Sequence, residues 1–357
     1  NISADLYFRN GSSDYVYLIS EDLNKFTGSL ELSGGDSGNN TTEAKPWMTA
    51  WDLFSDKENI EIDLLIAGAV ASEGAQVAST VQKYVSALAD SRMECLAIVD
   101  TPLELIVNKS VSEATDNIVE WRRGRKIGHN DQIVEHNMNI NSTYTVIIGN
   151  AKYQYDKYNG INRWIPLAGD IAGLCVRTDN VSYPWMSPAG FKRGMLKNVI
   201  KLAIETREAH RDRMYTEGVN PVCGFASSGF VLYGDKTATT IASPFDRINV
   251  RRLFNMLKRN ISKMARSVQF EINDEFTRYS FRTEASGYLG TIQDRGGMYN
   301  FLVQCDETNN TPQVIDSNNF VASFWIQPAR SINFIQLNFI ATATGADFQE
   351  LIGTAKI

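Results

Sequence analysis

Apolar residues in the first half of the chain follow two alternating periods. Short stretches of mostly apolar residues at 62–66, 95–99 and 144–148 are typical of short buried strands. Between these runs, apolar positions recur every three or four residues, which indicates amphipathic helices at 77–88 and 114–121. Strands that alternate with helices in this way predict a mainly parallel sheet with flanking helices, the α/β class.

Local sequence signals predict further elements before and within this pattern. Residues 1–32 are typical of strands joined by hairpin turns, and Asn-Gly at 10–11 is a strong turn dipeptide. Residues 47–54 place two Trp and one Phe on one helical face. Ser110 and Glu113 have the spacing of a capping box and predict the start of a helix.

The middle of the chain predicts a polar connection followed by one long helix. The connection covers residues 150–162, and the helix begins near Pro188 with apolar positions between 195 and 204. Gly218, followed by Pro221, would end it. The Gly/Ser-rich stretch at 224–229 is the predicted domain boundary, so residues 1–223 form the α/β domain.

The last third of the chain changes character. A Ser-Pro-Phe-Asp start predicts a helix at 246–268, and a second helix begins near residue 273. Alternating apolar positions predict three strands at 299–305, 320–326 and 335–341. This is an α+β domain with a small antiparallel sheet, whose open edges invite a strand from another chain.

Charge is distributed unevenly. Residues 1–120 carry 20 acidic and 7 basic residues, whereas residues 187–266 carry 15 basic and 6 acidic residues. The net charge of −6 argues against a general nucleic-acid coat. Two interpretations stay open: copies of the chain attract one another, acidic part to basic part, or the two charged faces are only solvated.

The helix at 246–268 has an apolar arc and a separate basic arc. The basic arc predicts either a docking face for an acidic partner or a solvated surface, and it has too few aromatic residues for nucleic-acid binding. Its members are Arg251, Arg252, Lys258, Arg259, Lys263 and Arg266.

The sequence contains no convincing catalytic or phosphate-binding motif. Gly35-Asp-Ser-Gly38 matches a serine-protease string, but no histidine lies in a context that would complete a triad. The stretch from Gly68 to Gly74, which follows the first buried strand, has neither a GxGxxG nor a Gly-Lys-Ser/Thr motif. Asp100 is expected to cap the next turn. The residues themselves therefore give no support for a catalytic site or a bound cofactor.

Metal, disulfide and membrane patterns are absent from the sequence as well. His129 and His136 are too sparsely flanked by ligands for a metal site. The four cysteines form no CxxC pair and are expected to be buried free thiols. No apolar run reaches the ~18 residues of a membrane helix, so no membrane insertion is expected.

Six sequence motifs from residue 164 onward are long and specific. They are Trp164-Ile-Pro-Leu-Ala-Gly-Asp-Ile-Ala-Gly-Leu-Cys-Val-Arg-Thr-Asp179, Trp185-Met-Ser-Pro-Ala-Gly190, Tyr233-Gly-Asp-Lys-Thr-Ala238, Ser243-Pro-Phe-Asp-Arg-Ile-Asn-Val-Arg-Arg-Leu-Phe254, Gln327-Pro-Ala-Arg-Ser-Ile332 and Ala341-Thr-Ala-Thr-Gly-Ala-Asp-Phe348. With these motifs the chain resembles the tail sheath protein of contractile-tailed bacteriophages of the T-even-like myovirus type, and weaker similarity extends almost to residue 1.

This resemblance implies the C-terminal part of a longer structural subunit, which agrees with a first residue that is Asn and not Met. Family members stack as hexameric rings in a helical tube around the tail tube protein, in the virion tail, after assembly in the host cytoplasm. The baseplate and tail terminator proteins are further partners. Contraction drives the tube through the host envelope for genome delivery. The resemblance also implies that the protein is not an enzyme and has no cofactor, which agrees with the failed search for a site.

If the chain belongs to this family, residues 224–357 are the inner assembly domain, and neighbouring subunits complete its sheet. The basic arc is then a candidate contact with the tube or between subunits. A C-terminal arm would be exchanged between neighbours, with candidate buried residues Phe339, Phe348, Leu351 and Ile352.

Two alternatives remain from the sequence alone. A nucleotide- or sugar-binding enzyme on the parallel sheet would bind its ligand near Gly68, Asp100 and Gly149. A monomeric adhesion module would not self-associate.

Overall fold

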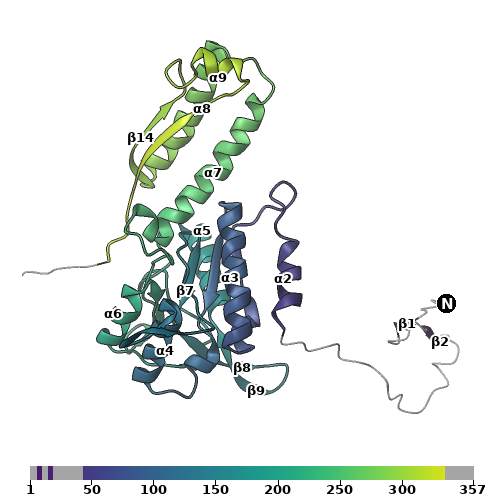
Figure 1. Cartoon of the computed structure of the whole chain (residues 1–357), viewed down its shortest axis with the longest axis vertical. Coiled ribbons are helices and arrows are strands. Elements are labelled where there is room, and N and C mark those ends of the chain that lie inside the picture. The colour runs from purple at the N-terminus through teal and green to yellow at the C-terminus, as the bar shows by residue number, and fades with distance from the viewer. Residues whose placement is uncertain (1–5, 10–14, 19–42, 334–357) are drawn as a thin grey trace, which may run out of the picture.

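The computed structural model of the chain describes residues 6–9, 15–18 and 43–333. The last range forms an α/β body and a C-terminal domain that extends from it (Figure 1). Strands β1 (Leu6–Arg9) and β2 (Tyr15–Leu18) pair antiparallel, which confirms the predicted hairpin strands near the start of the chain. The turn dipeptide at 10–11 lies outside the described residues.

A parallel sheet forms the centre of the body. Its four strands are β3 (Leu64–Ile66), β4 (Leu96–Asp100), β7 (Thr145–Ile148) and β11 (Val219–Asn220). Their spatial order is β11-β7-β4-β3, and every neighbouring pair is parallel. The three strands expected from apolar runs are therefore present, and the prediction of a parallel sheet is confirmed.

Helices cover both faces of this sheet. Ala97 of β4 packs with the cluster of α3 (Ala75–Arg92), whereas Leu96 and Ile98 pack with the cluster of α5 (Ala168–Val181). Successive residues of a strand point to opposite faces, so α3 and α5 lie on opposite sides. The other helical elements are α2 (Ala44–Asp52), η1 (Gly68–Ser72), η2 (Leu103–Leu105), α4 (Val111–Arg123) and α6 (Glu208–Thr216).

The start of α4 forms as its sequence indicates. The Ser110 hydroxyl accepts a hydrogen bond from the Glu113 backbone N–H at 3.2 Å. This bond satisfies one of the four free N–H groups at the start of the helix. The capping prediction is confirmed.

The prediction of one long helix from near Pro188 is wrong. Residues 188–207 are irregular or extended, and a helix, α6, begins only after them. A side chain at Gly194 would collide with the backbone of Gly190 and Leu232, 2.7 to 2.9 Å away. This close backbone approach holds the segment against the body. Its apolar stripe is therefore half buried along an extended chain.

The predicted polar connection at 150–162 is a hairpin. Strand β8 (Ala151–Asp156) pairs antiparallel with β9 (Ile161–Pro166), and β10 (Lys201–Leu202) adds to its other edge. Two smaller antiparallel pairs are β5 (Arg125–Lys126) with β6 (His129–Ile133), and β12 (Val222–Phe225) with β13 (Gly229–Leu232).

The stretch at 224–229 forms the turn of the β12–β13 hairpin. Val222 and Leu232, on its two strands, are fully buried in the cluster between the sheet and α5. The boundary between 1–223 and 224–357 stays a prediction, and the packing of this hairpin favours a later one.

The C-terminal domain packs two helices against a two-stranded antiparallel ribbon. The predicted helices and the first two predicted strands are confirmed, whereas the third, at 335–341, lies outside the described residues. The elements are η3 (Pro244–Asp246), α7 (Ile248–Val268), α8 (Glu275–Asp294), β14 (Met298–Gln304), α9 (Pro312–Asp316) and β15 (Ser323–Pro328). None of the helices in the described ranges combines the length and apolar character needed to cross a membrane.

All four cysteines are buried free thiols, as the sequence predicts. Burial raises the pKa of the Cys95 thiol to about 11. A thiol that stays protonated at neutral pH is a poor nucleophile, so Cys95 serves packing.

Candidate functional site at the joint between the two domains

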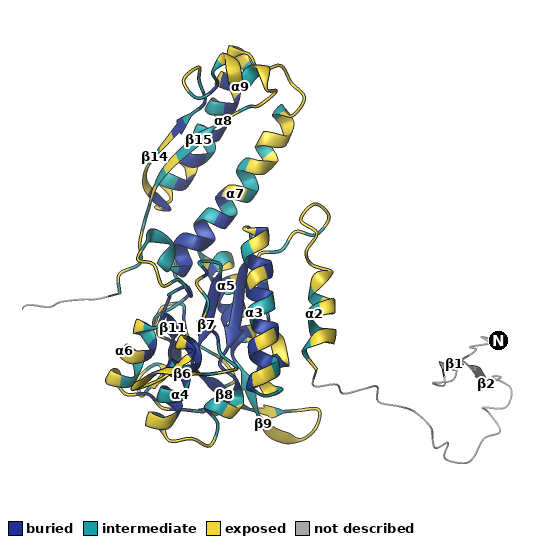
Figure 2. Cartoon of the chain, in the orientation of Figure 1, coloured by how far each residue is buried: buried dark blue, intermediate teal, exposed yellow. Residues whose placement is uncertain are grey.

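Helix α7 connects the C-terminal domain to the body. Its first half is buried and its second half is largely exposed (Figure 2). In the buried half, Arg252 donates hydrogen bonds to both carboxylate oxygens of Asp179, at 2.7 and 2.5 Å. Asp179 belongs to α5, so this charge pair joins the two domains.

Arg251 is buried beside Arg252 but has a different environment. Its guanidinium lies 4.1 Å from the centre of the Tyr144 ring and 4.0 Å from the centre of the Phe245 ring. Such contacts stabilise a cation through the negative faces of the rings. Burial lowers the pKa of Arg251.

The second half of α7 reaches the acidic edge of the body beside β3. Arg259 forms an ion pair with Asp63 at 2.5 Å, and it donates to the carbonyl oxygens of Ile62 and Glu94. One turn further on, Lys263 pairs with Glu61 at 2.9 Å. The basic helix and the acidic first half of the chain therefore attract each other within a single chain.

The prediction that all six positive charges of the basic arc lie on an exposed face is wrong for three of them. Arg251 and Arg252 are only 7% and 8% exposed, and Arg259 is half-buried. The arc faces the body over the first half of α7, so these charges are used inside the chain. Lys258, Lys263 and Arg266 remain exposed, although Lys263 already pairs with Glu61 of the same chain.

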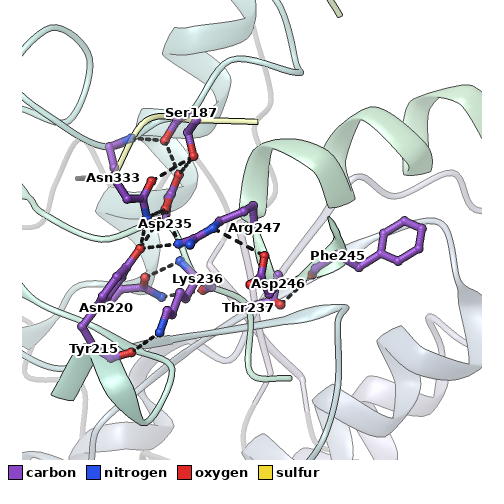
Figure 3. A network of polar contacts seen from close by, with 12 residues as sticks. Ser187, Tyr215, Asn220, Asp235, Lys236, Thr237, Phe245, Asp246, Arg247 and Asn333 are labelled. Carbon is purple, nitrogen blue, oxygen red and sulfur yellow. Dashed lines mark hydrogen bonds and ion pairs between the residues drawn. The ribbon is translucent and has the colours of Figure 1, made fainter. Parts of the chain in front are cut away.

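A second polar cluster at the joint surrounds Asp235 (Figure 3). Asp235 is 4% exposed, and its carboxylate accepts hydrogen bonds from the hydroxyls of Tyr215 at 3.0 Å and Ser187 at 3.2 Å. Arg247, which precedes α7, supplies the opposite charge at 3.4 Å. Burial, followed by the nearby charge of Asp235, raises the pKa of Tyr215, so its hydroxyl stays a proton donor.

The same carboxylate also binds residues of the 331–333 segment. Ser331 donates to one oxygen of Asp235, and the Asn333 amide donates to the other at 3.0 Å. Asn333 also donates to the Tyr215 hydroxyl. Residues 331–333 follow β15, so the Asp235 cluster holds this part of the chain against the joint.

Two hollows flank this joint. The larger, of about 600 Å³, lies between Trp185, Tyr233 and the 329–333 segment. The smaller, of about 420 Å³, lies between Arg123, Lys236 and Ile241. Neither hollow includes Gly68, Asp100 or Gly149.

Of the three residues that the alternative enzyme function placed near a nucleotide or sugar, Asp100 and Gly149 have structural roles. Asp100 is 1% exposed and accepts hydrogen bonds from the backbone N–H groups of Leu167 and Ala168, at 2.9 and 3.0 Å. It therefore caps the start of α5 and not the next turn. A Cβ at Gly149 would lie 2.8 Å from Val219, so the space beside it is filled.

Sequence reasoning did not identify Asp235, Tyr215 or Arg247 as a cluster, because they come from separate parts of the chain. The available signal was the string from Tyr233 to Ala238, which carried the resemblance without an assigned role. The arm candidates Phe339, Phe348, Leu351 and Ile352 lie outside the described residues.

Comparisons with known proteins agree with this two-part architecture. A family described as the phage tail sheath protein central domain matches residues 40–238, and one described as the phage tail sheath C-terminal domain matches residues 241–342. The tail sheath protein of Enterobacteria phage T4 is 56% identical over 99% of this chain and 53% of its own length. That of Vibrio phage KVP40 is 55% identical over 99% of this chain and 52% of its own length.

A solved structure shows the same fold at low identity. The helical sheath of the anti-feeding prophage in its contracted state has a TM-score of 0.65 at 18% identity, covering 86% of this chain and 76% of that one. The chain spans about half the length of the curated relatives it matches. Both family descriptions and both relatives agree, and the chain belongs to the phage tail sheath family.

Proposed function

We propose that this chain is part of a structural subunit of a contractile tail sheath. In this proposal the subunit polymerises helically around a tail tube and contracts to drive the tube through the host envelope for genome delivery. The observation that carries it is the 56% identity to a tail sheath protein across nearly the whole chain. The residues of the described joint act in packing and positioning, which supports a role without catalysis.

The proposed partners are further copies of the subunit in stacked hexameric rings, the tail tube protein, the baseplate and the tail terminator. Exposed Lys258, Lys263 and Arg266 on α7 are the proposed contacts with the tube or a neighbour, and Arg251, Arg252 and Arg259 serve the joint. Assembly takes place in the host cytoplasm, and the product belongs to the virion tail. No nucleic acid or membrane insertion is part of this function.

The antiparallel ribbon of the C-terminal domain supports exchange between subunits. Strands β14 and β15 pair only with each other in the part of the chain that the structure describes. Their outer edges leave backbone N–H and C=O groups available for another strand. We propose that neighbouring subunits complete this sheet, and that Phe339, Phe348, Leu351 and Ile352 lie on the exchanged arm.

Negative-stain electron microscopy of the complete subunit, expressed alone, tests this function. We expect tubes with a regular helical repeat. Monomers at every salt concentration, both alone and with the tail tube added as a template, would contradict the proposal.

A further inference from the structure

Two exposed strips of the body combine apolar side chains with charges that form no salt bridge in the described part of the chain. The acidic strip lies at the end of α2 and in the loop after it. It consists of Asp52, Leu53, Phe54, Asp56 and Glu58, with one base among them, Lys57, whose ammonium group donates to the Ser91 carbonyl oxygen. The basic strip lies in the extended segment before β10. It consists of Phe191, Lys192, Met195, Lys197 and Ile200.

Large apolar side chains are unusually open on both strips. Leu53 is 72% exposed on the acidic strip, and Met195 and Ile200 are 44% and 55% exposed on the basic strip. Apolar surface that is framed by charge is typical of protein-binding sites. The opposite charges of the two strips make each a suitable partner for the other.

Arg92 holds the acidic strip in one conformation. Its side chain is fully buried and donates to the backbone carbonyl oxygens of Phe54, Asp56 and Ile60. The Asp56 carboxylate in turn accepts hydrogen bonds from the backbone and side chain of Asn59, which lower its pKa and keep it charged. A loop fixed in this way loses little entropy on binding.

Arg177 of α5 plays the corresponding part under the basic strip. Its guanidinium donates to the carbonyl oxygens of Arg193 and Met195, at 2.8 and 2.7 Å. The backbone N–H of Ile200 donates to Tyr153 in β8 at 2.9 Å. The segment that was predicted as a helix is thus an ordered edge with its lysines outward.

The two strips belong to opposite sides of the central sheet. Trp47 and Trp51 of α2 pack in the cluster of α3, together with Ala97 of β4. Leu196 and Val199, inside the basic strip, pack in the cluster of α5, together with Ile98 of the same strand. Because residues 97 and 98 point to opposite faces, one molecule cannot bring its two strips together.

We propose that the acidic strip of one copy binds the basic strip of a second copy. Such a contact joins two different surfaces and leaves one of each free at the ends, so it propagates into rings or helices and does not close as a dimer. This inference rests on the proposed function, which requires a propagating contact, and it identifies the surfaces that make it.

Cysteine cross-linking of the whole chain tests the pairing, since the four native thiols are buried. Leu53→Cys and Met195→Cys are made as separate single variants and mixed with a short bis-maleimide linker. We expect heterodimers from the mixture and little product from either variant alone. A chain that carries both cysteines should give a ladder of oligomers.

Tyr158→Cys supplies the matched control, because Tyr158 is 97% exposed at the β8–β9 turn and belongs to neither strip. Equal cross-linking of Leu53→Cys to Tyr158→Cys would overturn the proposal. So would a strong homodimer of Leu53→Cys alone, or no heterodimer at any protein concentration.

Charge exchange gives an independent readout by sedimentation. Glu58→Lys and Lys197→Glu should each weaken association at low salt by about fivefold, and a mixture of the two should regain most of it. Lys157→Glu and Glu284→Lys make the same charge changes elsewhere and should have no effect. Regular tubes of complete subunits that carry either strip variant would reject these surfaces while the sheath function stands.

Discussion

The body and the C-terminal domain differ in how completely they cover their own sheets. Both faces of the parallel sheet lie under helices, and Ile98 and Val99 of β4 are fully buried. In the C-terminal ribbon Val303 is 7% exposed on the helix side, whereas Leu302 and its cross-strand partner Trp325 are 59% and 51% exposed. The body thus completes its own core, whereas the C-terminal ribbon leaves a second apolar face exposed.

The largest expected change in stability distinguishes the buried face of the ribbon from its exposed face. Leu289 of α8 is fully buried, and Leu289→Ala should lower the free energy of unfolding by about 2–5 kcal/mol. Leu302→Ala, on the open face, should change it by less than about 0.5 kcal/mol. Urea unfolding of each variant, followed by circular dichroism, measures both. Equal losses would mean that the open face supports the isolated domain.

A second substitution tests how the body is held together. The guanidinium of Arg122 donates to four backbone carbonyl oxygens, those of Met138, Ile140, Glu217 and Ala238. Arg122→Met leaves buried acceptors without a donor and should cost about 2–3 kcal/mol.

The adjacent Arg123 is the natural control for that change. Its ion pair with Glu217 is half exposed, so Arg123→Met should cost at most about 1 kcal/mol. Thermal unfolding of the two variants compares them directly. A loss at Arg123 as large as that at Arg122 would show that charge, and not carbonyl binding, stabilises this region.

A further prediction concerns how the stability of the body depends on pH. Burial raises the pKa of Asp100 to about 7, from an ordinary value of 3.8. The unfolded chain releases this proton at lower pH than the folded chain does, so the contribution of Asp100 to stability falls between pH 4 and pH 7. Asp100→Asn cannot titrate, and its stability should fall less over this range than that of the native chain. Parallel profiles would show that Asp100 does not titrate there.

Much of the body could be predicted from the sequence because its signals are local. Apolar runs predicted three of the four strands of the parallel sheet, β3, β4 and β7, and Ser110 with Glu113 predicted the start of α4. Such patterns depend on neighbours within a few residues, which sequence reasoning can see. Strand β11 was not predicted, because its residues were expected to follow the end of a helix.

The segment after Pro188 shows where such reasoning fails. Its apolar spacing is that of a helix, but Gly194 lies against the backbone of residues 190 and 232. That contact joins parts of the chain that are far apart in sequence. Tertiary packing outweighed the local pattern, as it often does for weak helix signals.

The sequence correctly predicted that the basic arc lies on a helix. The prediction that this arc is a free surface was wrong for three of its residues. Periodicity places Arg252 and Arg259 on one side of α7, but it does not reveal what that side faces. Their partners Asp179 and Asp63 are 73 and 196 residues away in sequence. The Asp235 cluster was missed for the same reason.

The arginines that bind carbonyl oxygens also determine how the body responds to mechanical load. A pull on the loop after α2 acts on three hydrogen bonds that converge on Arg92, and a pull on the segment before β10 acts on two at Arg177. Bonds that share a force must break together, and a guanidinium keeps its charge at any physiological pH. We therefore expect force that enters at either edge to reach the sheet before the edge itself unravels.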